Sequence, residues 1–108
     1  MERLPISVGI LAWKSGQTLV NTLNTYFQQE FLHQINDVCI LFQEFSQEDS
    51  QIAEHFNIPY IAKDSNIGIG KGFIELTKQA KTDNVLILEH DWKLIENKET
   101  TSKRYLLV

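Results

Sequence analysis

Two carboxylates flank a histidine directly after an apolar run, where residues 84–92 read Asn-Val-Leu-Ile-Leu-Glu-His-Asp-Trp. Side chains alternate along a strand, so Glu89 and Asp91 leave the same side if the strand continues through them, whereas His90 points away. Carboxylate oxygens are typical ligands of hard divalent cations such as Mg²⁺ or Mn²⁺, which also bind substrate phosphates. A metal site is one interpretation of this segment. A solvated turn after a strand is the other.

A glycine-rich segment, Ile-Gly-Ile-Gly-Lys-Gly at residues 67–72, precedes a stretch with helical spacing. Backbone N–H groups and the helix dipole at such a helix start can bind a phosphate, with Lys71 nearby. The glycine spacing matches neither the dinucleotide fingerprint nor the P-loop. The structural alternative is a flexible turn that lets the helix pack closely on a sheet.

Polar and aromatic residues also follow the two earlier predicted strands. Trp13 could stack on a nucleotide base or simply pack against the protein. Gln43 and Glu44 could hydrogen-bond a base or a ribose, or mark the point where a strand meets water. All these residues fall at predicted carboxyl ends of strands, which is the edge where open α/β sheets bind ligands.

The elements that must position these residues alternate along the chain. Apolar runs predict strands at 6–13, 38–45, 60–62 and 85–88, the last buried on both faces. Helical spacing predicts helices over 18–28, 48–56 and 73–80, the first capped by Ser15 or Thr18. Such alternation predicts a three-layer α/β fold of Rossmann type, with a mostly parallel sheet and helices on both faces.

Length and composition favour one globular domain over residues 1–108, with a polar tail from about residue 96 that ends in an apolar tetrapeptide resembling the start of another strand. Hydrophobic residues make up 43% of the chain and charged residues 22%, which argues against wholesale disorder. The net charge of −4 argues against binding to nucleic acid or an anionic membrane.

The expected location is cytoplasmic. Cys39 is the only cysteine, so an intrachain disulfide is impossible. No apolar run reaches the roughly 20 residues that cross a bilayer, so no membrane span is expected. The amino terminus lacks the basic flank and apolar core of a signal peptide.

Three segments occur in an order that resembles a known family. They are Ile-Ser-Val-Gly-Ile-Leu-Ala-Trp-Lys at 6–14, Asp-Ser-Asn-Ile-Gly-Ile-Gly-Lys-Gly at 64–72 and Val-Leu-Ile-Leu-Glu-His-Asp at 85–91. Together they are similar to the nucleotide-sugar-binding half of family 2 glycosyltransferases, which have the GT-A fold. Those enzymes commonly have a first strand ending in Thr-Tyr-Asn, an Asn-x-Gly-rich turn and a strand ending in Asp-x-Asp.

The resemblance implies a nucleoside-diphosphate sugar as donor and a divalent metal, Mn²⁺ or Mg²⁺, as cofactor. By position, Ala12 and Trp13 would line the base pocket and Lys71 would lie near the pyrophosphate. Asp91 would bind the metal, while Glu89, in place of the usual first Asp, would contact the ribose or assist the metal.

The chain departs from the family pattern in two places. Gln43 and Glu44 stand where family members usually carry Asp-Asp or Asp-Asn for nucleotide recognition. The acceptor-binding half and the catalytic base follow Asp-x-Asp in the family, so the fold is expected to be truncated after that strand. No catalytic base is assigned, and the acceptor is unknown.

Two alternatives to a glycosyltransferase remain open. One is a catalytically inactive module that binds a nucleotide-sugar or serves assembly without an acceptor half, with a second copy or a partner chain covering an open sheet edge. The other is a small flavodoxin-like module unconnected with sugars, although that interpretation does not predict an acidic pair after the fourth strand.

Overall fold

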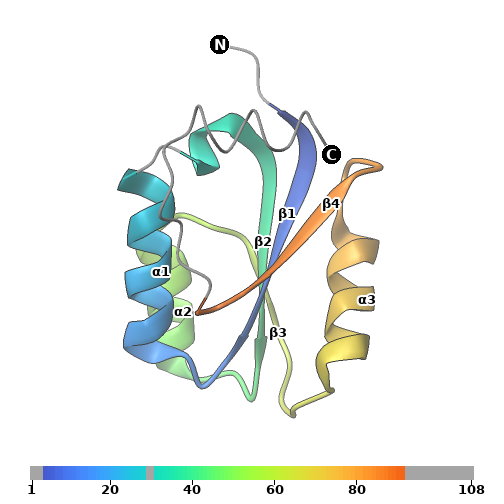
Figure 1. Ribbon diagram of the computed structural model, residues 1–108. Coiled ribbons are helices and arrows are strands. Elements are labelled where there is room, and N and C mark those ends of the chain that lie inside the picture. The colour runs from blue at the N-terminus through green and yellow to red at the C-terminus, as the bar shows by residue number, and fades with distance from the viewer. Residues whose placement is uncertain (1–3, 29–30, 92–108) are drawn as a thin grey trace.

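The computed structural model describes residues 4–28 and 31–91, in which four strands and three helices alternate (Figure 1). A short 3₁₀ turn, η1, precedes the second strand. In chain order the elements are β1 Leu4–Trp13, α1 Gly16–Gln28, η1 Leu32–Gln34, β2 Ile35–Gln43, α2 Gln47–His55, β3 Tyr60–Ala62, α3 Ile69–Gln79 and β4 Val85–Glu89.

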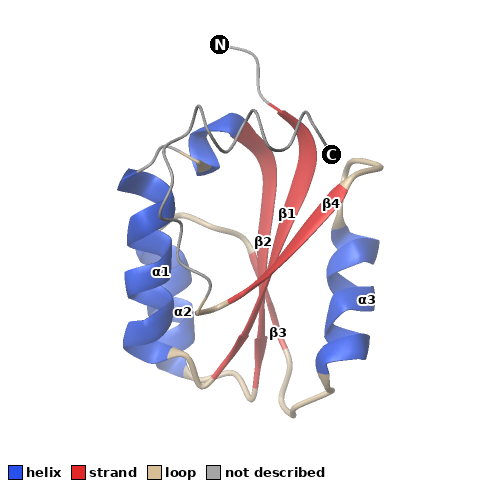
Figure 2. Cartoon of the chain, viewed as in Figure 1, coloured by secondary structure: helices blue, strands red, loops and turns tan. Residues whose placement is uncertain are grey.

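The four strands form one parallel sheet in the order β3-β2-β1-β4. Helices α1 and α2 cover one face of this sheet and α3 covers the other, giving three layers (Figure 2). This confirms the predicted α/β fold class. The two strands in the centre, β1 and β2, are the ones that the sheet buries most completely.

Strand alternation divides the interior into two cores. The larger core lies under α1 and α2 and includes Ile10, Ala12 and Phe42 from the sheet. The smaller core lies under α3 and is built around Leu11 and Leu41 with Leu76 of α3. Consecutive residues of β1 therefore belong to opposite faces, which decides which strand-end side chains can meet.

The last strand differs from its prediction. Residues 85–88 were expected to be buried on both faces, but Leu86 is 38% exposed and the other residues of β4 are only partly buried. Within the described residues, β4 pairs with β1 alone and so forms an edge of the sheet. An edge strand has fewer neighbours to cover it, so an apolar run does not by itself distinguish edge from centre.

The helix boundaries show which capping predictions hold. Thr18 lies inside α1, so it is not the cap; the backbone oxygen of Ser15 accepts the Thr18 N–H at 2.9 Å. The Ser15 hydroxyl is buried and has no partner among the described residues. At α2, Ser46 and Asp49 form a reciprocal capping box, each side chain accepting the other's backbone N–H.

Helix α3 packs closely on β1. A Cβ placed on Gly72 would lie 2.7 Å from Leu11 Cδ1, and one placed on Gly9 would lie 3.0 Å from Leu76 Cβ. The absence of side chains at both positions allows the helix to approach the strand. This confirms the structural interpretation for the third glycine of the glycine-rich segment.

The predicted polar tail from residue 96 and the predicted strand start at 105–108 lie outside the described residues. None of the helices within 4–28 and 31–91 has the length and apolar composition that a bilayer crossing requires.

Candidate functional site

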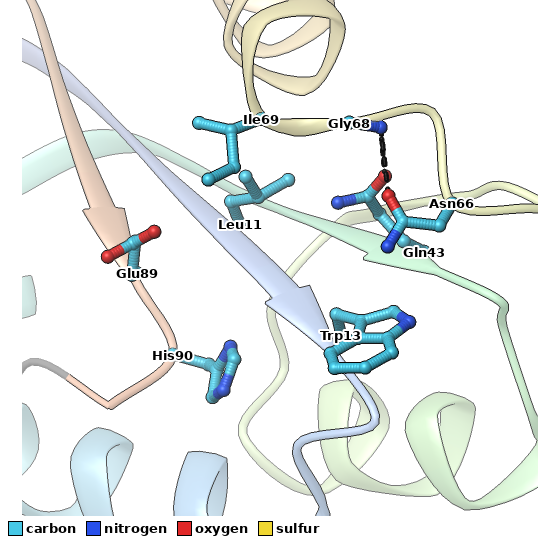
Figure 3. Close-up of a pocket in the computed structure, with 8 residues that line it drawn as sticks. All are labelled: Leu11, Trp13, Gln43, Asn66, Gly68, Ile69, Glu89 and His90. Atoms are coloured by element: carbon cyan, nitrogen blue, oxygen red, sulfur yellow. Dashed lines mark hydrogen bonds between the residues drawn. The ribbon is translucent and has the colours of Figure 1, made fainter.

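An open pocket of about 300 Å³ lies at the carboxyl edge of the sheet, on the face that α3 covers (Figure 3). It is bounded by strand ends on one side and by the loop that enters α3 on the other. The residues that line it are Leu11, Trp13, Gln43, Asn66, Gly68, Ile69, Glu89 and His90.

Strand register explains why three predicted site residues meet here. Trp13 is the register partner of Gln43 across β1 and β2, and Leu11 is the partner of Glu89 across β1 and β4. Register partners in a parallel sheet point to the same face, and residues two apart on one strand do so as well. Trp13, Gln43 and Glu89 therefore all project to the α3 side.

Gln43 bridges the end of β2 to the loop before α3. Its side chain is only 3% exposed, and its Oε1 accepts the backbone N–H groups of Ile67 at 2.6 Å and of Gly68 at 3.1 Å. These two bonds identify the oxygen, so the remaining atom is the Nε2 donor. Figure 3 shows this nitrogen directed away from the loop, toward Leu11.

The loop itself is shaped by Asn66 and Gly68. Asn66 Oδ1 accepts the Gly68 N–H at 2.8 Å, and Gly68 has a φ of +86°, which side chains rarely tolerate. Gly68 is the N-cap of α3 but supplies no side-chain cap, and the first backbone bond runs from Gly72 N–H to Gly68 O. Among the described residues, the N–H groups of Ile69, Gly70 and Lys71 in the first turn of α3 have no partner. They are therefore available to an anion.

Trp13 forms an exposed wall of the pocket, with 42% of its surface accessible. Its indole Nε1–H donates to the carboxylate of Glu44, and Lys14 Nζ lies 5.2 Å from the ring centroid and 4.0 Å from Glu44 Oε2. Lys14 and Glu44, which directly follow β1 and β2, have φ angles of +45° and +49°. Left-handed backbone at non-glycine residues is uncommon and clusters at functional sites.

The two carboxylates of the third motif do not share one environment. Strand β4 ends at Glu89, and the His90 N–H donates to Leu11 O before the chain turns. Glu89 lines the pocket, whereas Asp91 is exposed and is not a lining residue. Burial, and then the charge of Asp91, raise the pKa of Tyr26, which belongs to the core under α1. The Asp91 charge thus influences a phenol of the core under α1, whereas Glu89 lines the pocket on the α3 side.

The arrangement of Glu89 and Asp91 limits how a divalent cation could bind. The condition for both carboxylates to leave one side, a strand that continues through Asp91, is not met. Within residues 4–28 and 31–91 no three His, Cys, Asp or Glu side chains are grouped as a metal centre. Mg²⁺ usually binds through one or two carboxylates, with waters and substrate phosphates completing its shell. The pocket contains one carboxylate, that of Glu89, and one carboxylate is enough for a cation that waters and phosphates also coordinate.

Three other expected site residues lie outside the pocket lining. Ala12 is fully buried in the core under α1 and α2, because alternation turns it to the opposite face from Trp13. Lys71 is exposed in the first turn of α3. The Glu44 carboxylate accepts the Trp13 indole N–H, and Glu44 does not line the pocket.

Sequence reasoning named Asn66, Gly68 and Ile69 only as parts of the glycine-rich turn, and it did not assign Leu11 or His90 as site residues. The Asn-x-Gly spacing of Asn66 and Gly68 is the signal for this loop, because an Asn side chain commonly bonds the backbone two residues on. Leu11, Ile69 and His90 carry no comparable signal. They line the pocket because of strand register and the start of α3.

No family model matches the sequence, and no curated protein does so either. Among solved structures, the chain is similar to TarS from S. aureus, a glycosyltransferase, with a TM-score of 0.76 and 19% sequence identity. The match covers 95% of this chain and 19% of the TarS chain. The chain thus has a Rossmann-like glycosyltransferase fold and spans about a fifth of the length of TarS.

Proposed function

We propose that this chain is the nucleotide-sugar-binding domain of a glycosyltransferase, and that its strand-end pocket takes the nucleotide of a nucleoside-diphosphate sugar. The observation that carries the proposal is the pocket itself. It combines an exposed indole, amide donors, an open helix start and a carboxylate at the carboxyl edge of a parallel sheet. Ligands of open α/β sheets bind at this edge.

Each part of the pocket suits one part of such a donor. The Trp13 indole offers a flat face for the base. The amide nitrogen of Asn66 can donate to an acceptor atom, because its oxygen is engaged by the Gly68 N–H. The open first turn of α3, with Lys71 on its surface, can meet the diphosphate. Glu89 can accept hydrogen bonds from ribose hydroxyls.

A divalent cation, Mn²⁺ or Mg²⁺, is part of this proposal. Glu89 is supported as its ligand by its place in the pocket wall, and Asp91, two residues later in the turn, is the second carboxylate proposed. When bound, such a cation offsets the charge that develops on the leaving nucleoside diphosphate. The protein's own contribution is to hold the base, the diphosphate and the carboxylates in a fixed arrangement.

Sugar transfer is proposed as a property of the complete catalytic unit, with an acceptor of unknown chemistry. The chain corresponds to only 19% of TarS, and none of the described residues is assigned as a catalytic base. Binding and transfer are therefore separate parts of the proposal, and each needs its own measurement.

Calorimetric titration of the full chain with UDP and with GDP, each with and without Mn²⁺, tests the binding part. We expect binding of at least one nucleotide that strengthens with Mn²⁺, and loss of that Mn²⁺ dependence in Glu89→Ala and in Asp91→Ala. Glu54→Ala, an exposed position on α2, is the matched control and should bind as the wild type does. Absence of binding to either nucleotide under all conditions would refute the proposal.

Incubation with UDP-sugars and GDP-sugars then separates an enzyme from a binding module. Release of free sugar or its transfer to added acceptors, lost in Glu89→Ala, supports catalysis by this chain. Tight binding without turnover supports a donor-binding module that needs further chain for catalysis.

A further inference from the structure

The two side chains that end β2, Gln43 and Glu44, each hold a different wall of the pocket. We propose that both are positioning residues: Gln43 fixes the loop that enters α3 and Glu44 fixes the Trp13 indole, so both walls are formed before a ligand binds. This differs from the expectation that the pair contacts a base or ribose directly. It rests on the proposed function only in taking this pocket to be the ligand site.

The argument for Gln43 comes from burial and bond count. Its side chain is nearly fully buried, and its single oxygen accepts two consecutive backbone N–H groups, those of Ile67 and Gly68. Both lone-pair directions of that oxygen are thereby occupied. The loop lies 24 and 25 residues further along the chain, so this contact is tertiary and adds to the local bond from the Gly68 N–H to Asn66 Oδ1.

The argument for Glu44 comes from its backbone conformation and from its hydrogen bond to Trp13. Glu44 leaves β2 with a φ of +49°, and its carboxylate accepts the indole N–H of Trp13, the residue that ends the neighbouring strand β1. An indole has one polar donor, so this bond fixes the rotation of the whole ring. Lys14 lies beside the same carboxylate and over the same ring, which adds a charge contact to the arrangement.

This positioning also sets what the pocket offers a ligand. The oxygen of Asn66 accepts the Gly68 N–H, so the atom that Asn66 leaves for a ligand is its amide nitrogen, which can only donate, while Gln43 is nearly fully buried. The loop wall therefore recognises a ligand through acceptor atoms such as ring carbonyl or phosphate oxygens. A flat ring that stacks on the fixed indole would complete the recognition.

Indole mobility in the ligand-free protein tests the Glu44 contact. The chain has two tryptophans, Trp13 and Trp92, so the measurements use the full chain with Trp92→Phe, in which fluorescence reports Trp13 alone. We expect Glu44→Ala to lower the fluorescence anisotropy of Trp13 and raise its acrylamide quenching about twofold, and Glu44→Gln to retain the wild-type values, because an amide oxygen still accepts the Nε1–H. Unchanged values in Glu44→Ala would overturn the contact, and so would equal loosening in both variants.

Amide hydrogen exchange tests the Gln43 contact. Gln43→Glu keeps an oxygen for the two loop N–H groups and loses the NH₂ donor, whereas Gln43→Leu removes both. We expect the Ile67 amide to exchange roughly tenfold faster in Gln43→Leu and at the wild-type rate in Gln43→Glu, relative to amides in β1 of the same sample, whereas the Gly68 amide keeps its bond to Asn66 Oδ1 in both variants. That internal reference separates loop release from general instability. Equal exchange in Gln43→Leu and wild type would overturn the proposal.

Nucleotide affinity then distinguishes positioning from direct contact. If Gln43 acts by positioning, Gln43→Glu binds the nucleotide within a few-fold of wild type and Gln43→Leu binds about tenfold more weakly. Equal losses in the two variants would mean that Nε2 contacts the ligand and would overturn the positioning assignment. If the wild type binds no nucleotide, the proposed function fails, while exchange and fluorescence still decide the positioning contacts.

Discussion

Gly72 of α3 faces Leu11 of β1 so closely that a Cβ at position 72 would lie 2.7 Å from Leu11 Cδ1. The contact sets how near α3 lies to the sheet and therefore where the loop wall of the pocket stands. Gly70, one residue before Lys71, has no atom within 4 Å of the corresponding Cβ position. The two glycines thus form a matched pair for mutation.

Gly72→Ala should lower the free energy of unfolding relative to Gly70→Ala by about 1–3 kcal/mol, because overpacking a core contact costs that much. Both substitutions gain helix propensity, up to about 1 kcal/mol, so their difference isolates the contact. Urea unfolding of the two variants and the wild type measures it. Equal stabilities would show that Leu11 moves aside freely.

Gly68→Ala should destabilise the protein by about 1–3 kcal/mol, because a φ of +86° with a ψ of 164° lies in a region open essentially only to glycine. No steric contact contributes, since no atom lies within 4 Å of a Cβ built there. Thermal unfolding of Gly68→Ala and Gly70→Ala measures the destabilisation caused by the strained backbone at position 68. A Gly68→Ala variant as stable as Gly70→Ala would contradict the assigned conformation.

Ser46→Ala should cost about 0.5–2 kcal/mol of stability, the usual range for loss of an N-cap side chain. Ser46 caps α2 by accepting the Asp49 N–H, and Asp49 returns the bond to the Ser46 N–H. The matched control is Ser50→Ala, whose hydroxyl donates only to the Gln47 carbonyl inside the helix and whose loss should change stability little. Urea unfolding of both variants distinguishes the loss of the N-cap bond from the effect of replacing any serine in α2 by alanine.

Alkaline titration should reveal the effect of the Asp91 charge on Tyr26. Burial, and then the Asp91 charge, raise the pKa of the Tyr26 phenol, so the folded protein holds this proton more tightly than the unfolded chain. The stability linked to this group is complete below the usual tyrosine pKa of about 10 and falls as pH rises toward the raised pKa, by up to about 1.4 kcal/mol per pH unit.

Asp91→Asn should lower the pKa of Tyr26, whereas Glu89→Gln should leave it unchanged, because the causes that raise this pKa are burial and the Asp91 charge. Tyrosinate absorbance measures the ionisation, with Tyr26→Phe identifying the signal of that residue. A shift of the same size in Glu89→Gln would show that the effect is not specific to the Asp91 charge.

Much of the fold followed from local pattern. The strand at 60–62 was predicted with its observed bounds, and α1 and α2 within two residues at each end, whereas α3 begins at Ile69, four residues before its predicted start. These elements were predictable because alternation, helical spacing and breakers such as Pro59 act over a few residues. The burial of β4 was not predictable, because whether an apolar strand lies at an edge depends on which strands pair beside it.

The site was predictable in part for the same reason. The order of apolar and polar residues predicts that Trp13, Gln43 and Glu89 stand at strand ends. Their meeting in one pocket depends on register, which pairs Trp13 with Gln43 and Leu11 with Glu89. The same register turns Ala12 into the opposite core, where sequence position alone had assigned it to the pocket.

By itself, the sequence determined the alternating elements, the carboxyl edge that carries the candidate site and the likeness of three motifs to glycosyltransferases. Only the tertiary structure decided what the residues at that edge do. It ended β4 at Glu89, so that Asp91 lies in the following turn, and it brought the Gln43 oxygen to a loop 24 residues away. Hydrogen-bonding side chains take the partners that folding brings within reach, and those partners are distant in sequence.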